Sequence, residues 1–243
     1  RWTKPYEGKI AEPSRLLYAA AVTHMDDAIG RIVGALDHSG LREKTLILFT
    51  SDNGAPRGSD DGSPKNYGGK FGPTPVLGNN LPLRGWKGQV FEGGIRVPAF
   101  VNWRGTLAPR TVTAPIGALD WLPTLARFVG APADLGNRSH WEGIDVWKPL
   151  AEGDAGPSRT LYWKNDQWTA IRQGDWKLVR RVPPKNRDAQ AKAPAEAASS
   201  PLLFNLAGDP NETTDLASRH PSEVARLSRL LQEQQSLDPA PSR

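Results

Sequence analysis

The sequence predicts an α/β fold followed by a small antiparallel sheet, and three patterns support this prediction. Residues 13–36 repeat apolar side chains at three- and four-residue spacing, which is typical of an amphipathic helix that ends near Gly40. Residues 45–50 are a continuous apolar run, which indicates a strand buried on both faces, as in a parallel sheet. Further on, short strand-like pieces alternate with turn signals, as in an antiparallel sheet. We therefore expect a large α/β domain over residues 1–158 and a small subdomain over residues 159–243.

Two more elements are expected in the first domain. Residues 97–103 read as a second buried strand, and residues 120–129 as a helix with Asp120 as its N-cap and Gly130 at its end. Between the two expected strands, residues 54–83 are rich in Gly, Pro, Asn and Asp. Loops of that length in compact domains are usually functional or disordered.

The second domain is expected to contain three short strands and a closing helix. The strands fall at residues 161–163, 168–171 and 176–179, separated by Asn-Asp and Gly-Asp turns. Residues 183–201 form a low-complexity insertion of Ala, Pro and Lys. Residues 221–237 predict a helix with proline in its first turn and one apolar face.

The composition narrows the class of protein. A hydrophobic fraction of 38% and a charged fraction of 23% suit a soluble globular protein. The net charge of +5 comes without a dense basic run, which disfavours nucleic acid as a partner and suits an anionic substrate. No apolar run is long enough to cross a membrane. The chain has no cysteine, so this segment holds no disulfide, cysteine nucleophile or thiolate metal site. It begins with Arg1 and no signal peptide, so we expect the original N-terminus to be missing.

The first chemical signal follows the apolar strand directly. Ser51-Asp52-Asn53-Gly54 lies where the strand ends, and in open α/β sheets ligands bind outside the carboxyl ends of strands. Asp52 offers carboxylate oxygens and Asn53 an amide oxygen, which are the ligands that Ca²⁺ and Mg²⁺ prefer. Taken alone, the tetrapeptide is also an ordinary turn.

The second signal is a lysine between glycines. Lys87 stands in Gly85-Trp86-Lys87-Gly88, just before Glu92-Gly93-Gly94. A lysine held there can act as a point charge for a tetrahedral oxyanion, although a loop lysine is more often a solvated surface residue. Trp86 could flank a sugar or aromatic ring, or pack in the core. Among the histidines, only His140 is a candidate substrate contact.

Taken together, these blocks resemble the sulfatase family of the alkaline phosphatase superfamily, as in arylsulfatases and N-acetylgalactosamine-4-sulfatase. The motifs appear in the family's order over nearly the whole chain, which matches the C-terminal portion of the family. They are residues 18–30, 51–54, 87–98, 120–125, 174–178 and 203–212.

The resemblance implies an alkaline-phosphatase-like sandwich with a central mixed or parallel sheet. It implies an active site around Ca²⁺ (or Mg²⁺), with Asp52 and Asn53 as two metal ligands and Lys87 as the lysine that contacts the sulfate group. The substrate would be a sulfate ester, such as a sulfated glycan or an aryl sulfate. The family's nucleophile is a formylglycine hydrate, made from the first residue of Cys-x-Pro-x-Arg or from serine in that place. Family resemblance also favours a periplasmic or secreted location, which the residues themselves leave open.

The chain departs from the family at that nucleophile. Pro-Ser-Arg occurs three times, but the residues two positions upstream are Ala11, Ala155 and Pro239, and none of these can become formylglycine. We expect the nucleophile segment to lie upstream of Arg1 and the chain alone to be inactive. Two alternatives stay open: a phosphatase or phosphonate hydrolase of the same superfamily, and a non-catalytic truncated product.

Overall fold

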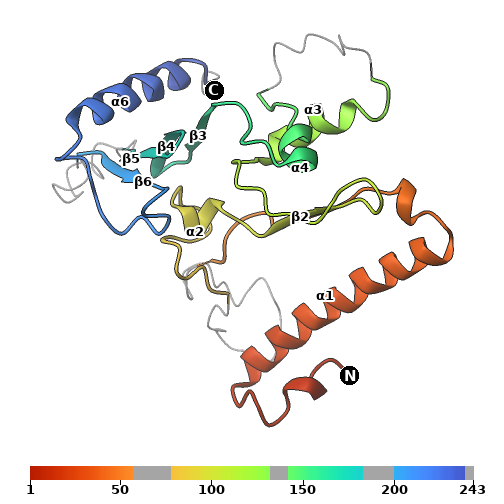
Figure 1. The fold of residues 1–243 in the computed structure, drawn as a ribbon. Coiled ribbons are helices and arrows are strands. Elements are labelled where there is room, and N and C mark those ends of the chain that lie inside the picture. Colours follow the sequence, from red (N-terminus) through yellow and green to blue (C-terminus); the bar gives the residue numbers. More distant parts are fainter. Residues whose placement is uncertain (57–77, 132–141, 183–199, 239–243) are drawn as a thin grey trace, which may run out of the picture. The chain divides into compact units, whose positions relative to one another are not determined.

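The computed structural model describes residues 1–56, 78–131, 142–182 and 200–238 (Figure 1). The chain forms two compact units. The first combines Arg1–Asp26, Thr50–Pro98 and Ser158–Arg243, and the second combines Asp27–Phe49 and Ala99–Pro157. The division into residues 1–158 and 159–243 stays a prediction.

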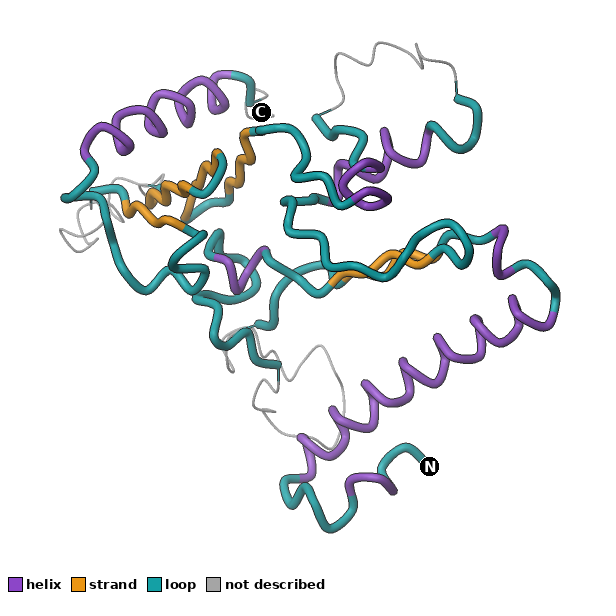
Figure 2. The backbone as a smooth tube through the Cα atoms, in the orientation of Figure 1, coloured by secondary structure: helices purple, strands orange, loops and turns teal. Residues whose placement is uncertain are grey.

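The first unit is built on a four-stranded antiparallel sheet in the order β3-β4-β5-β6. Its strands are β3 (Thr160–Lys164), β4 (Trp168–Gln173), β5 (Trp176–Arg181) and β6 (Leu202–Asn205) (Figure 2). The first three strands confirm the predicted antiparallel sheet. The sequence did not predict β6, because four residues after a low-complexity stretch carry too little periodicity.

The two faces of this sheet bury different partners. On one face, α6 (Pro221–Ser236) packs Leu227 and Leu231 against the sheet (Figure 1). The strand residues in this cluster are Ile171, Leu178 and Leu203. On the other face, Val90 and Phe91 pack against the alternate strand residues. Those residues are Ala170, Val179 and Phe204. The predicted closing helix is therefore confirmed, and the sheet lies between it and the segment that follows Lys87.

The remaining helices of the first unit are short or belong partly to the second unit. A 3₁₀ turn, η1 (Lys4–Tyr6), precedes α1 (Pro13–His38), the long helix predicted from its periodicity. Residues of α1 belong to both units. One turn of helix, α2 (Glu92–Ile95), precedes the strand expected at residues 97–103.

Besides the end of α1, the described residues of the second unit form a two-stranded sheet and two short helices. Strand β1 (Ile47–Thr50), which follows the 3₁₀ turn η2 (Arg42–Lys44), pairs with β2 (Ala99–Asn102). The helices are α3 (Trp121–Ala126), preceded by η4 (Ala118–Asp120), and α4 (Trp147–Glu152). An aromatic cluster of Trp103, Phe128 and Trp147, with ring centroids 4.6–6.0 Å apart, packs inside this unit.

Two expectations about the second unit need correction. The strands at residues 45–50 and 97–103 were both expected to be buried, but β1 is only half-buried and β2 is mostly exposed, with Phe100 49% exposed. Within the described residues β1 and β2 pair only with each other, so both strands are edge strands. The helix expected over residues 120–129 ends at Ala126, and Asp120 is not a side-chain N-cap. Its carboxylate instead accepts the amides of Gly117 and Ile144, at 2.7 and 3.0 Å.

None of the helices among the described residues has the length and apolar character needed to cross a bilayer.

Candidate active site

Asp52 and Asn53 follow the end of β1, as the sequence predicts. The amide of Ser51 donates to the carbonyl oxygen of Pro98 at 3.1 Å, which joins the end of β1 to the start of β2. Asp52 is exposed, and its Oδ1 accepts the amide of Asn53 at 2.9 Å. The side-chain amide nitrogen of Asn53 donates to the carbonyl of Gly54 at 3.1 Å. With its nitrogen engaged, the amide oxygen is the atom of Asn53 suited to a cation.

The Lys87 loop is bonded directly to the segment that follows Asn53. The backbone N–H of Lys87 donates to the carbonyl oxygen of Ala55 at 3.0 Å. Asn80 fixes the same junction. Its side chain accepts the amide of Ala55 at 2.7 Å, and its Nδ2 donates to the carbonyls of Ala55 and Gly85, each at 3.0 Å. Lys87 is thus hydrogen-bonded to the residue two positions after Asn53.

Glycines make this close approach possible. A Cβ atom on Gly54 would lie 1.8 Å from the carbonyl oxygen of Gly93, a distance that no side chain tolerates. The amide of Gly54 also donates to the carbonyl of Gly94 at 3.0 Å. Gly85 and Gly88 adopt φ angles of +93° and +82°, which favour glycine. The Glu-Gly-Gly motif therefore brings the Asp52 loop and the Lys87 loop into backbone contact.

Four of the five candidate site residues lie among the described residues. Asp52, Asn53 and Lys87 belong to two loops that bond to each other, and the side chains of Asp52 and Lys87 are exposed. Trp86 is 36% exposed, so it is not part of the buried core. His140 lies outside the described residues, and its role as a substrate contact stays a prediction.

The residues present fit a hard cation by type but not by number. Ca²⁺ usually takes six to eight oxygen ligands. Asp52 supplies one carboxylate and Asn53 one amide oxygen, and the described part of the chain contains no group of three or more His, Asp or Glu side chains placed to hold a metal. The two residues therefore suit part of a ligand shell that needs further donors.

A buried ion cluster lies behind the Lys87 loop, and the sequence analysis missed it. Lys177 of β5 is fully buried, and its Nζ lies 2.8 Å from Oε1 of Glu92 and 2.9 Å from Oε1 of Glu212. Oε2 of Glu212 accepts the amide of Glu92 at 2.6 Å. Burial raises the pKa of the Glu212 carboxyl, and the neighbouring Lys177 ammonium opposes that rise. Arg96 lies 4.0 Å from Oε2 of Glu92 and is 59% exposed, so Lys177 is the closer partner of Glu92.

The loop that carries Glu212 is shaped by Asp209. The carboxylate of Asp209 accepts the amides of Thr213 and Thr214, each at 2.8 Å, and the hydroxyl of Thr213 at 3.0 Å. Partial burial acts to raise the pKa of Asp209, but these hydrogen bonds lower it overall. Within this turn Glu212 has a φ of +55°, rare for a residue with a side chain. The turn thus directs Glu212 into the protein toward Lys177.

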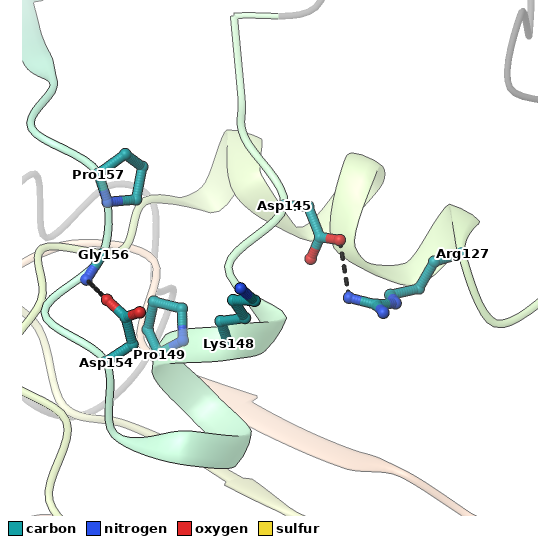
Figure 3. A pocket seen from close by; sticks show the side chains of 7 residues that line it. All are labelled: Arg127, Asp145, Lys148, Pro149, Asp154, Gly156 and Pro157. Atoms are coloured by element: carbon teal, nitrogen blue, oxygen red, sulfur yellow. Dashed lines mark hydrogen bonds and ion pairs between the residues drawn. The ribbon is translucent and has the colours of Figure 1, made fainter.

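A separate pocket of about 430 Å³ lies within the second unit (Figure 3). Its charged lining is mixed: Arg127 pairs with Asp145 at 2.9 Å, and Asp154 accepts the amide of Gly156 at 2.7 Å. With Lys148 the lining carries two basic and two acidic side chains, so its formal charges balance.

Sequence comparison decides the family. The profile of the Sulfatase family matches residues 2–131, and that of the C-terminal region of aryl-sulfatase matches residues 157–243. The chain belongs to the sulfatase family. It is 30% identical to arylsulfatase J of Mus musculus over 90% of this chain and 39% of that protein. The chain therefore spans about two fifths of that relative's length.

Solved structures agree on the fold. Ps i-CgsB in complex with k-i-k-neocarrahexaose matches with a TM-score of 0.72 and 24% identity, over 96% of this chain and 45% of that chain. The phosphonate monoester hydrolase of Agrobacterium radiobacter matches with a TM-score of 0.59 and 23% identity, over 91% and 41%. The alkaline-phosphatase-like α/β fold expected from the motifs is confirmed.

Proposed function

We propose that the whole protein is a sulfuric ester hydrolase whose active site includes Asp52, Asn53 and Lys87. The observation that carries this proposal is the hydrogen bond from the Lys87 amide to Ala55, which fastens the lysine loop to the loop of the two candidate metal ligands. Family membership supplies the reaction class, because the sulfatase profile covers both loops.

Each residue has a physical role in this proposal. Asp52 and Asn53 hold one side of a divalent cation, Ca²⁺ or Mg²⁺, which when bound would neutralise negative charge on the sulfate oxygens. Lys87 places a compact positive charge where a sulfuryl oxygen can accept a hydrogen bond from its ammonium group. Such fixed charges stabilise the charge that develops as the ester bond breaks.

The nucleophile is proposed to lie outside these 243 residues. Formylglycine requires Cys or Ser in the family's motif, and the three Pro-Ser-Arg copies have Ala11, Ala155 and Pro239 in that place. The chain by itself should therefore show no sulfatase activity.

The substrate is proposed to be a sulfated glycan or an aryl sulfate. Ps i-CgsB was solved with an oligosaccharide, and arylsulfatase J is named for aryl sulfates. The exposed Trp86 beside Lys87 offers a flat apolar surface against which a sugar or aryl ring could stack.

The second candidate function is hydrolysis of a phosphate or phosphonate monoester, which the structural match to a phosphonate monoester hydrolase favours. A non-catalytic truncated product is the third. Turnover of 4-nitrophenyl sulfate, 4-nitrophenyl phosphate and a phenyl phosphonate ester by the whole protein separates them. A higher kcat/KM for the sulfate supports the proposal, a higher value for either phosphorus ester favours the second candidate, and no turnover of any favours the third.

A further inference from the structure

The C-terminal sheet contacts the segment after Lys87 at three successive places. Nδ2 of Asn165, in the turn between β3 and β4, donates to the carbonyl of Gly88 at 2.8 Å. Val90 and Phe91 are buried against the sheet, and the Phe91 ring meets the Trp168 ring edge-on at a centroid distance of 5.3 Å. Glu92 then joins the buried Lys177. Residues 88–92 are therefore docked along one face of the sheet.

Hydrogen bonds within the turn between β3 and β4 fix the position of Asn165. Its Oδ1 accepts the backbone amides of Gln167 and Trp168, each at 2.8 Å, and its backbone N–H donates to the carbonyl oxygen of Trp168 at 2.9 Å. The two bonds to Oδ1 fix the side chain within its own turn, so Nδ2 is held in one direction. That direction is toward Gly88, next to Lys87.

We propose that Asn165 is a positioning residue for Lys87, and that the C-terminal sheet acts as the template on which the lysine loop is held. The bond to Gly88 fixes the loop immediately after Lys87, while the bond from the Lys87 amide to Ala55 aligns it with the Asp52 loop. The effect of Asn165 on catalysis rests on the proposed function, whereas its effect on the position of the lysine loop does not.

Asn165→Asp is the selective variant. It keeps an oxygen that can accept the Gln167 and Trp168 amides but replaces the donor toward Gly88 with an acceptor. Lys164→Ala is the matched control, because it removes the neighbouring side chain and its ion pair with Asp238 but leaves Asn165 intact.

The first measurement is amide hydrogen exchange by NMR on the 243-residue chain. In Asn165→Asp the Lys87 amide should exchange at least about tenfold faster, while strand amides such as Leu178 keep their protection. Lys164→Ala should leave the Lys87 amide unchanged. An unchanged Lys87 amide in Asn165→Asp would overturn the proposal, as would equal loss of protection in the control.

The second measurement is the kinetics of the whole protein on an aryl sulfate. Asn165→Asp should lower kcat about tenfold and change KM by less than about twofold, because a displaced lysine loses interactions made mainly in the transition state. If the amide result holds but kcat is unchanged, the positioning role in catalysis is wrong. If the parent protein hydrolyses no sulfate ester, the proposed function fails and the exchange result still decides whether Asn165 holds the loop.

Discussion

The Nζ atom of Lys177 lies 2.8 Å from Oε1 of Glu92, although the two residues are 85 positions apart in the sequence. Glu92 begins the turn of helix that packs under the lysine loop, and Lys177 lies in the middle strand pair of the C-terminal sheet. With Glu212 they form a fully buried cluster of one cation and two carboxyl groups. Part of the family's C-terminal region is thereby joined to the loop proposed to contact substrate.

Removing the cation of this cluster should destabilise the protein strongly. Lys177→Met leaves two buried carboxyl groups without the cation that lies between them, and breaking such a buried pair typically costs about 3–5 kcal/mol. Urea unfolding followed by tryptophan fluorescence measures the change. The double variant Lys177→Met/Glu212→Gln should recover part of the loss, because one carboxyl group is then neutral. A single-variant loss below about 1 kcal/mol would show that the cluster does not stabilise the fold.

The stability of the protein should also depend on pH through Glu212. Its pKa is raised by burial above the ordinary value of 4.5, so the folded state binds the proton more tightly than the unfolded state does. That contribution to stability is fully present below pH 4.5 and is lost as pH rises through the folded pKa.

Glu212→Gln tests this relationship, since glutamine does not titrate. Unfolding free energy measured from pH 4 upward should fall less steeply in Glu212→Gln than in the parent. Glu223→Gln, a change in a partly exposed carboxylate of α6, is the control and should keep the parent's slope. Equal slopes in the parent and in Glu212→Gln would contradict the prediction.

The sequence predicted the elements whose pattern is local. The helix at residues 13–36, the three strands of the C-terminal domain and the closing helix all carry their periodicity within one segment, and all are present. The strand β6 and the helix α2 are four residues long each, too short to show a period.

The buried cluster could not be predicted in the same way. Glu92 and Glu212 are 120 residues apart, and the local sequence around each gives no indication of the other. One signal was present: Lys177 is two residues before Val179 on a strand, so it shares the inward face with a core residue. A lysine at such a position requires a buried acidic partner.

A single methyl group at Gly54 should separate the two loops of the candidate site. In Gly54→Ala the new Cβ would lie 1.8 Å from the Gly93 carbonyl oxygen, so backbone must shift. The expected loss is about 1–3 kcal/mol, with faster exchange of the Lys87 amide.

Gly34→Ala is the matched glycine control. Gly34 lies within α1, and nothing stands within 4 Å of its added Cβ. The change should be neutral or stabilise by about 0.5–1 kcal/mol, because alanine favours helix. Thermal unfolding compares the two variants, and a Gly54→Ala protein as stable as the parent would contradict the close packing.

The affinity for Ca²⁺ should depend on how many oxygen ligands the protein supplies. Asp52 and Asn53 alone offer too few oxygens for Ca²⁺, so the 243-residue chain should bind it more weakly than about 10⁻³ M in calorimetric titration. The whole protein should bind it tightly, and Asp52→Ala should remove most of that affinity. Tight binding by the isolated chain, or full metal content in Asp52→Ala, would contradict the assignment.

The most direct test of the proposed active site is the turnover of an aryl sulfate by the whole protein and its Lys87→Ala variant at equal metal content. Loss of one fixed group that stabilises developing charge typically lowers kcat about 10²–10³-fold. Lys87→Ala should therefore keep its bound metal and fold but lose that much of its kcat, while Lys164→Ala retains the parent's rate. Turnover by Lys87→Ala at the parent's rate would contradict the proposed role of Lys87 and, with it, the site.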